Sequence, residues 1–396
     1  MLKIPRIWTG PAEAVLYITF ILFIIGTVNV FSASFVLAGQ LLDDSYFFLK
    51  RHLISFAIGM VGLIIATKPD YRKLNRLSGL LAVMTLGMLI AVHFTGVDAN
   101  GARRWLNLGI KFQPSEIAKL ASVIVAASYL GPRIDRKRKI SLLSLPVIFI
   151  GIMGVLILKQ PDMGTAVIVV GLCLILYVLA GLPKQQLYLL YGGGAAVIAY
   201  FSYAAAYRMD RITAWLDPWE HQQGIGYQTV QSLLAIGSGG LSGTGLGMGA
   251  SKFYYLPESH TDFAFAVLCQ EWGFFGALLV LVLMGLLACY GGQIARRTPD
   301  GFGKILAIGV TLLVAGQAVI NIGMVSGLLP VVGVPLPFIS FGGTSLIVNL
   351  VAMGILINIG RRSARPAVPM DELSELEPSE KPEKRLKLVQ RLKDRR

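Results

Sequence analysis

Three ionisable side chains, Glu258, His260 and Asp262, stand close together in the segment YYLPESHTDFAF, residues 254–265. A long and almost wholly apolar run follows. A charge bordering such a run is costly unless water reaches it or it has a function. A carboxylate here can accept a proton from an attacking hydroxyl, as a general base must. Capping of the next helix by Thr261 or Asp262, worth about 1 kcal/mol, is the simpler alternative, but it leaves His260 and Glu258 unexplained.

A second charged group lies in GVDANGARRWLNLGIKFQPSEIAK, residues 96–119. Pro114 suits the first turn of a helix, where its missing N–H costs nothing. Glu116 and Lys119 then share one face of that helix. A local ion pair, with Lys119 extending toward the membrane interface, explains these residues about as well as a functional site does. Ionisable groups inside membrane spans, however, usually face a cavity and serve a function.

Three further segments are unusual. Asp162 stands in KQPDMGT, residues 159–165, where a turn-forming aspartate is the simpler interpretation. The longest polar connection, residues 207–261, contains GSGGLSGTGLGMG, which fits neither nucleotide-binding fingerprint. We interpret this run as flexible backbone able to approach a ligand closely. The uncharged segment LLPVVGVPLPFISFGGTS, residues 328–345, has too many prolines and glycines for a helix. Irregular backbone at membrane depth must be buried by protein or line a wet cavity, so the segment predicts a re-entrant loop.

Together these groups indicate a chemistry. Cations such as Arg103, Arg104 and Lys119 can hold a phosphate or pyrophosphate headgroup, and Asp262 can take a proton from an attacking hydroxyl. This combination fits group transfer from a lipid-pyrophosphate donor. The sequence has no visible nucleophilic triad, and its four histidines lack metal-ligand spacing. The three cysteines lie in apolar runs and are interpreted as core residues.

The elements that must position these residues are membrane-spanning helices. The chain of 396 residues is 55% hydrophobic and only 15% charged, whereas soluble domains carry about 25% charged residues. Apolar runs of about 18 residues or more are transmembrane candidates. We therefore predict an all-α polytopic membrane protein with ten spans. The spans cover residues 13–36, 47–67, 74–94, 114–131, 141–158, 164–182, 187–206, 262–290, 303–327 and 343–360.

The distribution of basic residues sets the orientation. Ten spans place both termini on one side, which then holds 26 of the 36 Lys and Arg residues, against nine on the opposite side. The positive-inside rule makes the richer side cytoplasmic. Topology thus explains the net charge of +14, and no nucleic-acid partner is expected.

The predicted organisation is one membrane domain and one tail. Residues 1–360 form the ten-span domain, with a large extracytoplasmic loop, 207–261, between spans seven and eight and a re-entrant loop, 328–343, before span ten. Residues 361–396 form a cytoplasmic tail with an acidic block and then a basic block, a composition that predicts disorder. The unusual segments described above all fall on the extracytoplasmic side.

Five motifs occur in order between about residue 100 and residue 362. They are GARRWLNLG with FQPSEIAK, QPDMGT, GYQTVQSLLAIGSGGL, YLPESHTDFAFAV and LPFISFGGTS. The combination resembles the SEDS family (shape, elongation, division and sporulation), the FtsW/RodA peptidoglycan glycosyltransferases. The resemblance implies polymerisation of lipid II, the undecaprenyl-pyrophosphate-linked disaccharide peptide, at the outer face of the bacterial cytoplasmic membrane. It also implies a class B penicillin-binding transpeptidase and other divisome proteins as partners.

The resemblance extends to single residues. The family's essential aspartate falls on Asp262, which we expect to act as general base. Its cavity-lining acid and lysine fall on Glu116 and Lys119. Its QPD aspartate falls on Asp162, and its outer-loop tryptophan on Trp105. The predicted substrate-binding set is Arg103, Arg104, Trp105, Glu116, Lys119, Asp162, His260, Ser340, Gly342 and Gly343.

Some details depart from the family's pattern or stay open. Phe341 stands where the family usually has tyrosine, and Thr344 where it has serine. The run GLGMGASKFYYLPE looks more like the division-type FtsW than the elongation-type RodA. A divalent cation, magnesium or manganese, is left open as a cofactor.

Other functions compete with a division-type polymerase. A RodA-type elongation polymerase is the alternative within the family. A lipid II flippase predicts polar groups that continue into the cytoplasmic half of the bundle, and the sequence has none visible there. A non-catalytic scaffold that recruits wall enzymes leaves the acid–base cluster unexplained.

Overall fold

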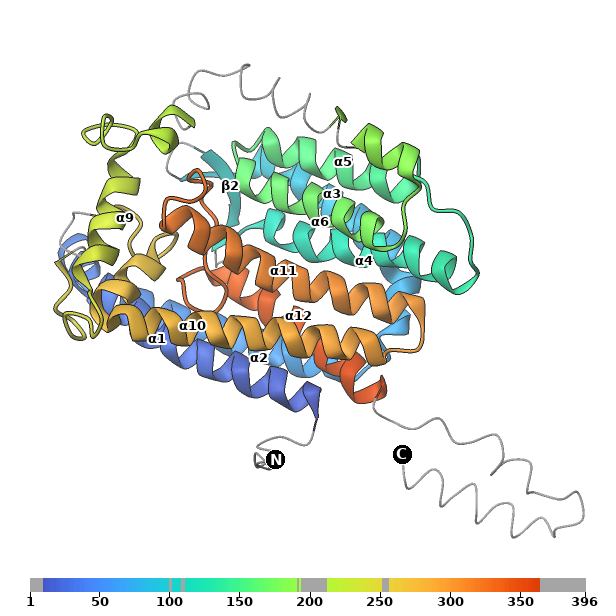
Figure 1. Ribbon diagram of the computed structural model, residues 1–396, viewed down its shortest axis with the longest axis horizontal. Coiled ribbons are helices and arrows are strands. Elements are labelled where there is room, and N and C mark those ends of the chain that lie inside the picture. Colours follow the sequence, from blue (N-terminus) through green and yellow to red (C-terminus); the bar gives the residue numbers. More distant parts are fainter. Residues whose placement is uncertain are drawn as a thin grey trace, which may run out of the picture.

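The computed structural model describes residues 10–99, 102–107, 111–190, 192–193, 212–250 and 256–363 (Figure 1). Most of this part of the chain is helical. The helices are α1 (Pro11–Leu42), α2 (Phe47–Thr67), α3 (Arg72–Thr95), α4 (Pro114–Asp135), α5 (Leu145–Leu158), α6 (Met163–Leu179), α9 (Tyr227–Ser238), α10 (Ala264–Arg297), α11 (Gly301–Val325) and α12 (Gly343–Ser363). Three short strands, β1 (Val97–Ala99), β2 (Ala102–Asn107) and β3 (Lys111–Phe112), lie between α3 and α4.

Seven of these helices are long and apolar enough to cross a membrane: α1, α2, α3, α4, α10, α11 and α12. The apolar helices α5 and α6 are shorter, with 14 and 17 residues. All of them coincide with predicted spans, as expected for a polytopic membrane protein. The predicted seventh span, residues 187–206, lies largely outside the described residues.

The expectation of an all-α protein is wrong in one place. The strands form a three-stranded antiparallel sheet in the order β1-β2-β3, between two of the predicted spans. Ala99 of β1 pairs with Ala102 of β2. The sequence between them is Asn-Gly, the dipeptide most typical of two-residue hairpin connections. The signal was therefore present in the sequence, but the search for membrane spans overlooked it.

Both described ends of the chain lie at the same end of the helix bundle. A Cβ placed on Gly360, near the end of α12, would lie 3.1 Å from the Cβ of Ala12 in the first turn of α1. We call this the terminal end, and the opposite end, where α10 and α12 begin, the Asp262 end. Figure 1 shows α1, α10 and α12 running between the two ends, with α9 and its neighbouring loops beyond the Asp262 end.

Residues 326–342, which join α11 to α12, form irregular backbone that we call the Pro–Gly segment. It penetrates the bundle, because the carbonyl oxygen of Pro335 accepts a hydrogen bond of 2.8 Å from Gln317. Gln317 lies eight residues before the end of α11, which is about 12 Å along the helix axis. A Cβ on Gly26 of α1 would overlap the carbonyl oxygen of Phe338, so glycine makes room for the segment. The segment is thus irregular backbone packed among the helices, and its assignment as a re-entrant loop stays a prediction.

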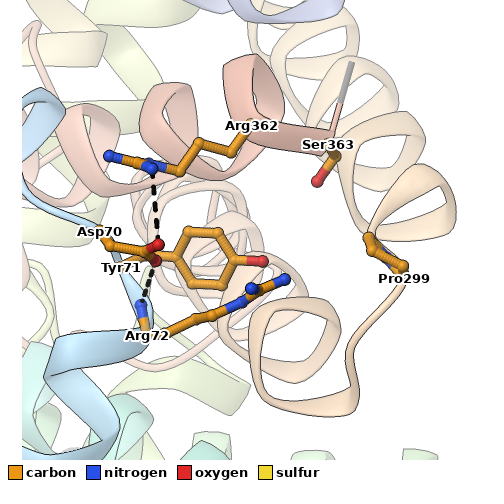
Figure 2. A pocket seen from close by; sticks show the side chains of 6 residues that line it. All are labelled: Asp70, Tyr71, Arg72, Pro299, Arg362 and Ser363. Carbon is orange, nitrogen blue, oxygen red and sulfur yellow. Dashed lines mark hydrogen bonds and ion pairs between the residues drawn. The ribbon is translucent and has the colours of Figure 1, made fainter. Parts of the chain in front are cut away.

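A pocket of about 170 Å³ lies at the terminal end (Figure 2). Its lining residues are Asp70, Tyr71, Arg72, Pro299, Arg362 and Ser363. Arg362 forms an ion pair of 3.4 Å with Asp70, and Arg72 forms one of 3.3 Å with Asp300. These pairs join α12 to the α2–α3 connection, and α3 to the start of α11. We therefore regard the charges at this end as ties between helices.

Candidate active site

Asp262 lies in a turn that precedes α10, at the Asp262 end of the bundle. The helix begins at Ala264, and its N-cap residue is Phe263, which makes no side-chain capping bond. The proposed capping role of Thr261 or Asp262 therefore finds no support at that position. Asp262 is partly exposed. A Cβ on Gly333 would lie 3.4 Å from Asp262 Oδ2, so the carboxylate faces the Pro–Gly segment.

The turn that carries Asp262 is built on Glu258. Its carbonyl oxygen accepts bonds from the backbone N–H groups of Thr261 (3.1 Å) and Phe263 (3.2 Å). Its side chain accepts a bond of 2.7 Å from the Thr261 hydroxyl. Glu258 has a positive φ of 53°, which is uncommon for a residue other than glycine and is often found at functional sites. Glu258 thus shapes the turn.

His260 is buried on the inner side of this turn. Its side chain packs against Phe48 and Phe341, with ring centroids 4.4 Å and 5.9 Å away. Its backbone oxygen accepts a bond of 2.9 Å from the Phe341 N–H. Burial lowers the pKa of His260 below its ordinary value of 6.5, and the Glu258 carboxylate opposes this shift. The ring is therefore neutral near pH 7 and ties the turn to the Pro–Gly segment.

Glu116 and Lys119 form a buried ion pair near the start of α4. The Lys119 Nζ and Glu116 Oε2 atoms are 2.8 Å apart, and the two side chains are only 2% and 5% exposed. Lys119 does not extend toward the interface, so that part of the simpler interpretation is wrong. Its ammonium group also donates a bond of 2.8 Å to Oε1 of Gln317 on α11. The pair therefore connects α4 to α11.

Two amides on α11 complete the connection between these segments. Gln317 donates to the carbonyl oxygen of Pro335 (2.8 Å). Asn321, one turn further, donates to the carbonyl oxygens of Asp262 (2.8 Å) and Val334 (2.7 Å). Our sequence analysis did not select either amide. The available signal was a pair of amides four residues apart within an apolar span.

Asp162 is the N-cap of α6. Its Oδ1 accepts a bond of 3.1 Å from the Thr165 N–H, and its Oδ2 accepts one of 3.1 Å from the Gln113 side chain. The side chain of Arg104 donates to the carbonyl oxygens of Gln160 (3.1 Å) and Pro161 (2.6 Å). Both residues therefore fix the connection between α5 and α6 and its contacts with β2 and the start of α4. The simpler reading of Asp162 accounts for its geometry.

The other predicted residues lie at the same end of the bundle. Arg103 is exposed and Trp105 is half-buried on β2, on either side of an irregularity in the pairing of β2 with β1. Ser340 is buried, and its hydroxyl accepts a bond of 2.9 Å from the Leu336 N–H. Gly343 begins α12, and a Cβ there would lie 3.3 Å from the Ser55 hydroxyl. A Cβ on Gly342 would likewise lie against the side chains of Ser345 and Pro335.

The glycine-rich run, residues 237–249, ends α9 with its first two residues and packs into a break in α10 with the rest. Gly273 interrupts that helix with φ 67° and ψ −162°. Backbone groups that the break deprives of helical partners bond to the run, as the Phe274 N–H does to the Gly240 oxygen at 2.9 Å. The close approach that the glycines allow is thus to α10. This packing corrects our interpretation of the run as flexible.

A further buried carboxylate, Glu271, lies just before this break. It is 2% exposed, and the Ser32 hydroxyl of α1 lies 2.7 Å from both of its oxygens. The described residues bury six histidine, lysine or acidic side chains: His52, Glu116, Lys119, Asp162, His260 and Glu271. Each of the six lies near the start of a helix that begins at the Asp262 end. His52, Glu116, Lys119 and Glu271 are among the first eight residues of α2, α4 and α10. Asp162 directly precedes α6, and His260 lies just before α10.

The described residues contain no group of three or more His, Cys, Asp or Glu side chains that could hold a metal ion. The chemistry that they offer is therefore a partly exposed carboxylate, a nearby neutral imidazole and a buried cation. Such an arrangement can remove a proton and stabilise a growing negative charge.

Two curated relatives extend over nearly the whole chain. Stage V sporulation protein E of Bacillus subtilis (strain 168) is 40% identical over 361 residues, which cover 90% of this chain and 98% of that protein. A probable peptidoglycan glycosyltransferase FtsW of Geobacter sp. (strain M18) is 39% identical over 354 residues, which cover 88% of this chain and 96% of that protein.

Solved structures share the fold. A chain of a peptidoglycan synthase complex, described for its structural coordination of polymerization and crosslinking, matches with a TM-score of 0.74 and 27% identity, covering 91% of this chain and 100% of that chain. The rod shape determining protein RodA of Thermus thermophilus matches with a TM-score of 0.65 and 27% identity, covering 89% and 97%. The family model of FtsW, RodA and SpoVE, described as cell cycle protein, matches residues 13–365. These findings confirm the resemblance inferred from the five motifs: the chain belongs to the FtsW/RodA/SpoVE family, the SEDS proteins.

Proposed function

We propose that this chain is a peptidoglycan glycosyltransferase that polymerises lipid II into glycan strands for the septal wall of dividing cells. The names of its FtsW relatives support both the activity and the division role. The observation that carries the proposal is the setting of Asp262. This partly exposed carboxylate stands between a tight turn and the Pro–Gly segment, at the end of the bundle that gathers the buried ionisable groups.

In the proposed reaction, Asp262 acts as the general base. Its carboxylate takes the proton from an acceptor sugar hydroxyl, whose oxygen attacks the anomeric carbon of a lipid-linked donor. The glycosidic bond forms as the bond from this carbon to the pyrophosphate oxygen breaks. Undecaprenyl pyrophosphate leaves with the electron pair, and Asp262 then passes its proton to water.

Cations at this end offset the charge that grows on the leaving pyrophosphate. Lys119 is engaged with Glu116 and Gln317, and Arg104 with two backbone carbonyls. Arg103 is exposed at this end, so it is our candidate for direct contact with pyrophosphate, and Lys119, paired with Glu116, remains one of the proposed cations. The remaining predicted residues shape the path of the donor: Trp105, Glu116, Asp162, His260, Ser340, Gly342 and Gly343.

The proposed topology has ten spans in the bacterial cytoplasmic membrane, with both termini cytoplasmic and the Asp262 end outside. The shared location of the two described ends supports an even number of spans. The positions of the described chain before and after residues 180–211 support the proposal of a seventh span. The segment leaves α6 at the terminal end, and the chain after it contacts the Asp262 end, where Trp215 donates a bond of 3.1 Å to the Gly327 oxygen.

The proposed partners are a class B penicillin-binding transpeptidase and other divisome proteins. The structural neighbour that coordinates polymerization with crosslinking supports the first of these. A divalent cation, magnesium or manganese, stays a proposed cofactor; magnesium at phosphate-transfer sites is usually held by one or two carboxylates together with substrate phosphates.

The alternative of a lipid II flippase is less well supported. Transport across the bilayer would favour polar groups along the whole route. The buried histidine, lysine and acidic side chains of the described residues instead all lie at the Asp262 end.

Incubation of the purified chain and its candidate transpeptidase with lipid II tests the proposal, with glycan strands separated by gel electrophoresis. We expect a ladder of polymer, and no movement of lipid II between leaflets when the chain is reconstituted alone in vesicles. Movement between leaflets without any polymer would replace the transferase with the flippase.

A further inference from the structure

Gln317 and Asn321 form a pair of buried amides on one face of α11. They are four residues apart, so they are neighbours on the helix surface, and they are only 1% and 0% exposed. A buried amide is costly unless its polar groups are hydrogen-bonded. The hydrogen bonds that these side chains donate must therefore offset the cost of burial, which for Asn321 includes an Oδ1 atom that is buried without a partner among the described residues.

The partners of the two amides are successive carbonyls of the Pro–Gly segment. Asn321 donates to Val334, and Gln317 donates to Pro335, at 2.7 and 2.8 Å. Irregular backbone inside a membrane bundle needs donors from outside the segment, because it has no regular bonds of its own. The amides supply them and so fix the depth of the segment along α11.

Asn321 also connects the segment to the proposed general base. The same amide nitrogen donates to the backbone oxygen of Asp262 at 2.8 Å. Gly333, next to Val334, stands opposite Asp262 Oδ2. One side chain thus sets both the backbone that carries the carboxylate and the backbone that faces it.

The buried ion pair orients the second amide. Lys119 donates to Oε1 of Gln317, and Glu116 holds Lys119 in place. With its oxygen directed at the ammonium group, Gln317 must turn its N–H group toward Pro335. The contacts run without a gap from Glu116 through α11 to the backbone of Asp262.

We propose that Gln317 and Asn321 are positioning residues that hold the Pro–Gly segment and Asp262 in register, so that they set the rate of polymerisation and not the affinity for lipid II. This inference rests on the proposed glycosyltransferase function. A displacement of about 1 Å in a reacting group can cost roughly 100-fold in rate. Removal of either amide should therefore lower kcat and leave KM nearly unchanged.

Asn358 offers a matched control. It is also a buried asparagine that donates to backbone carbonyls, those of Ala66, Thr67 and Pro69, but it lies at the terminal end. Asn321→Leu removes two donated bonds, whereas Asn358→Leu removes three and the bond that its Oδ1 accepts from Arg362, so Asn358→Leu should lower the melting temperature at least as much. Only Asn321→Leu should reduce kcat, by about 10- to 100-fold, and Gln317→Met should follow it.

The experiment combines two measurements on the full chain with its transpeptidase. The first is kcat and KM for lipid II in the native chain and in Asn321→Leu, Gln317→Met and Asn358→Leu. The second is amide hydrogen exchange of residues 328–342, which we expect to accelerate in the first two variants only. Equal kcat in the Asn321 and Asn358 variants, or a rise in KM alone, would overturn the inference. An inactive native chain would overturn the proposed function instead, while the exchange measurement would still decide whether the amides hold the segment.

Discussion

At the residue scale, each buried ionisable side chain is stabilised by the groups that it contacts. Lys119 has a carboxylate and an amide oxygen within 2.8 Å, so its charge is compensated inside the bundle. His260 is held by aromatic rings and kept neutral by burial. The sequence singled out four of the six buried histidine, lysine and acidic side chains, because charge near an apolar run is conspicuous, but it did not single out His52 or Glu271. It did not reveal the neutral amides of Gln317 and Asn321, whose importance depends on contacts with distant segments.

The ion pair in α4 predicts a non-additive stability. Lys119→Met leaves Glu116 buried without its cation and should cost about 3–5 kcal/mol of the free energy of unfolding. The double variant Glu116→Gln/Lys119→Met removes both charges and should recover most of this loss. Thermal unfolding in detergent measures both. A double variant less stable than Lys119→Met would contradict the account of a compensated buried pair.

The burial of His260 predicts a pH dependence of stability. Its pKa is lowered in the folded chain, so the unfolded chain binds the proton first as the pH falls below the ordinary value of about 6.5. The native chain should therefore lose stability between pH 7 and pH 5. In His260→Gln this loss should be smaller. Melting temperatures across this pH range provide the test, and equal slopes for the two chains would exclude this role of His260.

At the element scale, the irregular segments pack closely against helices because glycines leave room for their backbone. The Pro–Gly segment could be predicted from its composition, since prolines and glycines in an uncharged stretch exclude a helix. The break at Gly273 could not, because one glycine in an apolar run also fits a continuous helix. What distinguishes it is the glycine-rich run, a distant segment whose backbone groups bond to those of the broken helix.

The contact between α1 and the Pro–Gly segment can be tested with two glycines. A Cβ on Gly26 would overlap the Phe338 oxygen, whereas a Cβ on Gly79 of α3 meets nothing within 4 Å. Gly26→Ala should therefore destabilise the chain by about 1–3 kcal/mol and slow polymerisation. Gly79→Ala should be neutral or stabilise by up to about 1 kcal/mol. Similar melting temperatures for the two variants would show that the Pro–Gly segment can shift away from α1 without loss of stability.

At the scale of the whole molecule, the two ends of the bundle differ in kind. The terminal end has exposed basic residues and ion pairs that join helices. The Asp262 end also has exposed charges, such as Lys50 and Asp44, but among the described residues it alone buries histidine, lysine and acidic side chains. The positive-inside rule places the terminal end in the cytoplasm, and this orientation stays a prediction. The sheet between α3 and α4 was not predicted, although it positions Arg103 and Arg104.

The proposed orientation predicts which end an external reagent reaches. Met248, at the Asp262 end, is 75% exposed, and Leu143, between α4 and α5, is 94% exposed. In a chain whose native cysteines are replaced, Met248→Cys should react with a membrane-impermeant maleimide in spheroplasts. Leu143→Cys should react only after the membrane is permeabilised. The reverse pattern would invert the topology and place Asp262 in the cytoplasm.

The most direct test of the account is lipid II polymerisation by Asp262→Asn beside Asp70→Asn, each with the transpeptidase present. Asp70 lies at the terminal end, where it pairs with Arg362, so its variant controls for the loss of one carboxylate. We predict that Asp262→Asn keeps the native melting temperature and loses at least about 100-fold in rate, while Asp70→Asn polymerises normally. Equal polymer from Asp262→Asn and the native chain would contradict the central claim that this carboxylate is the general base.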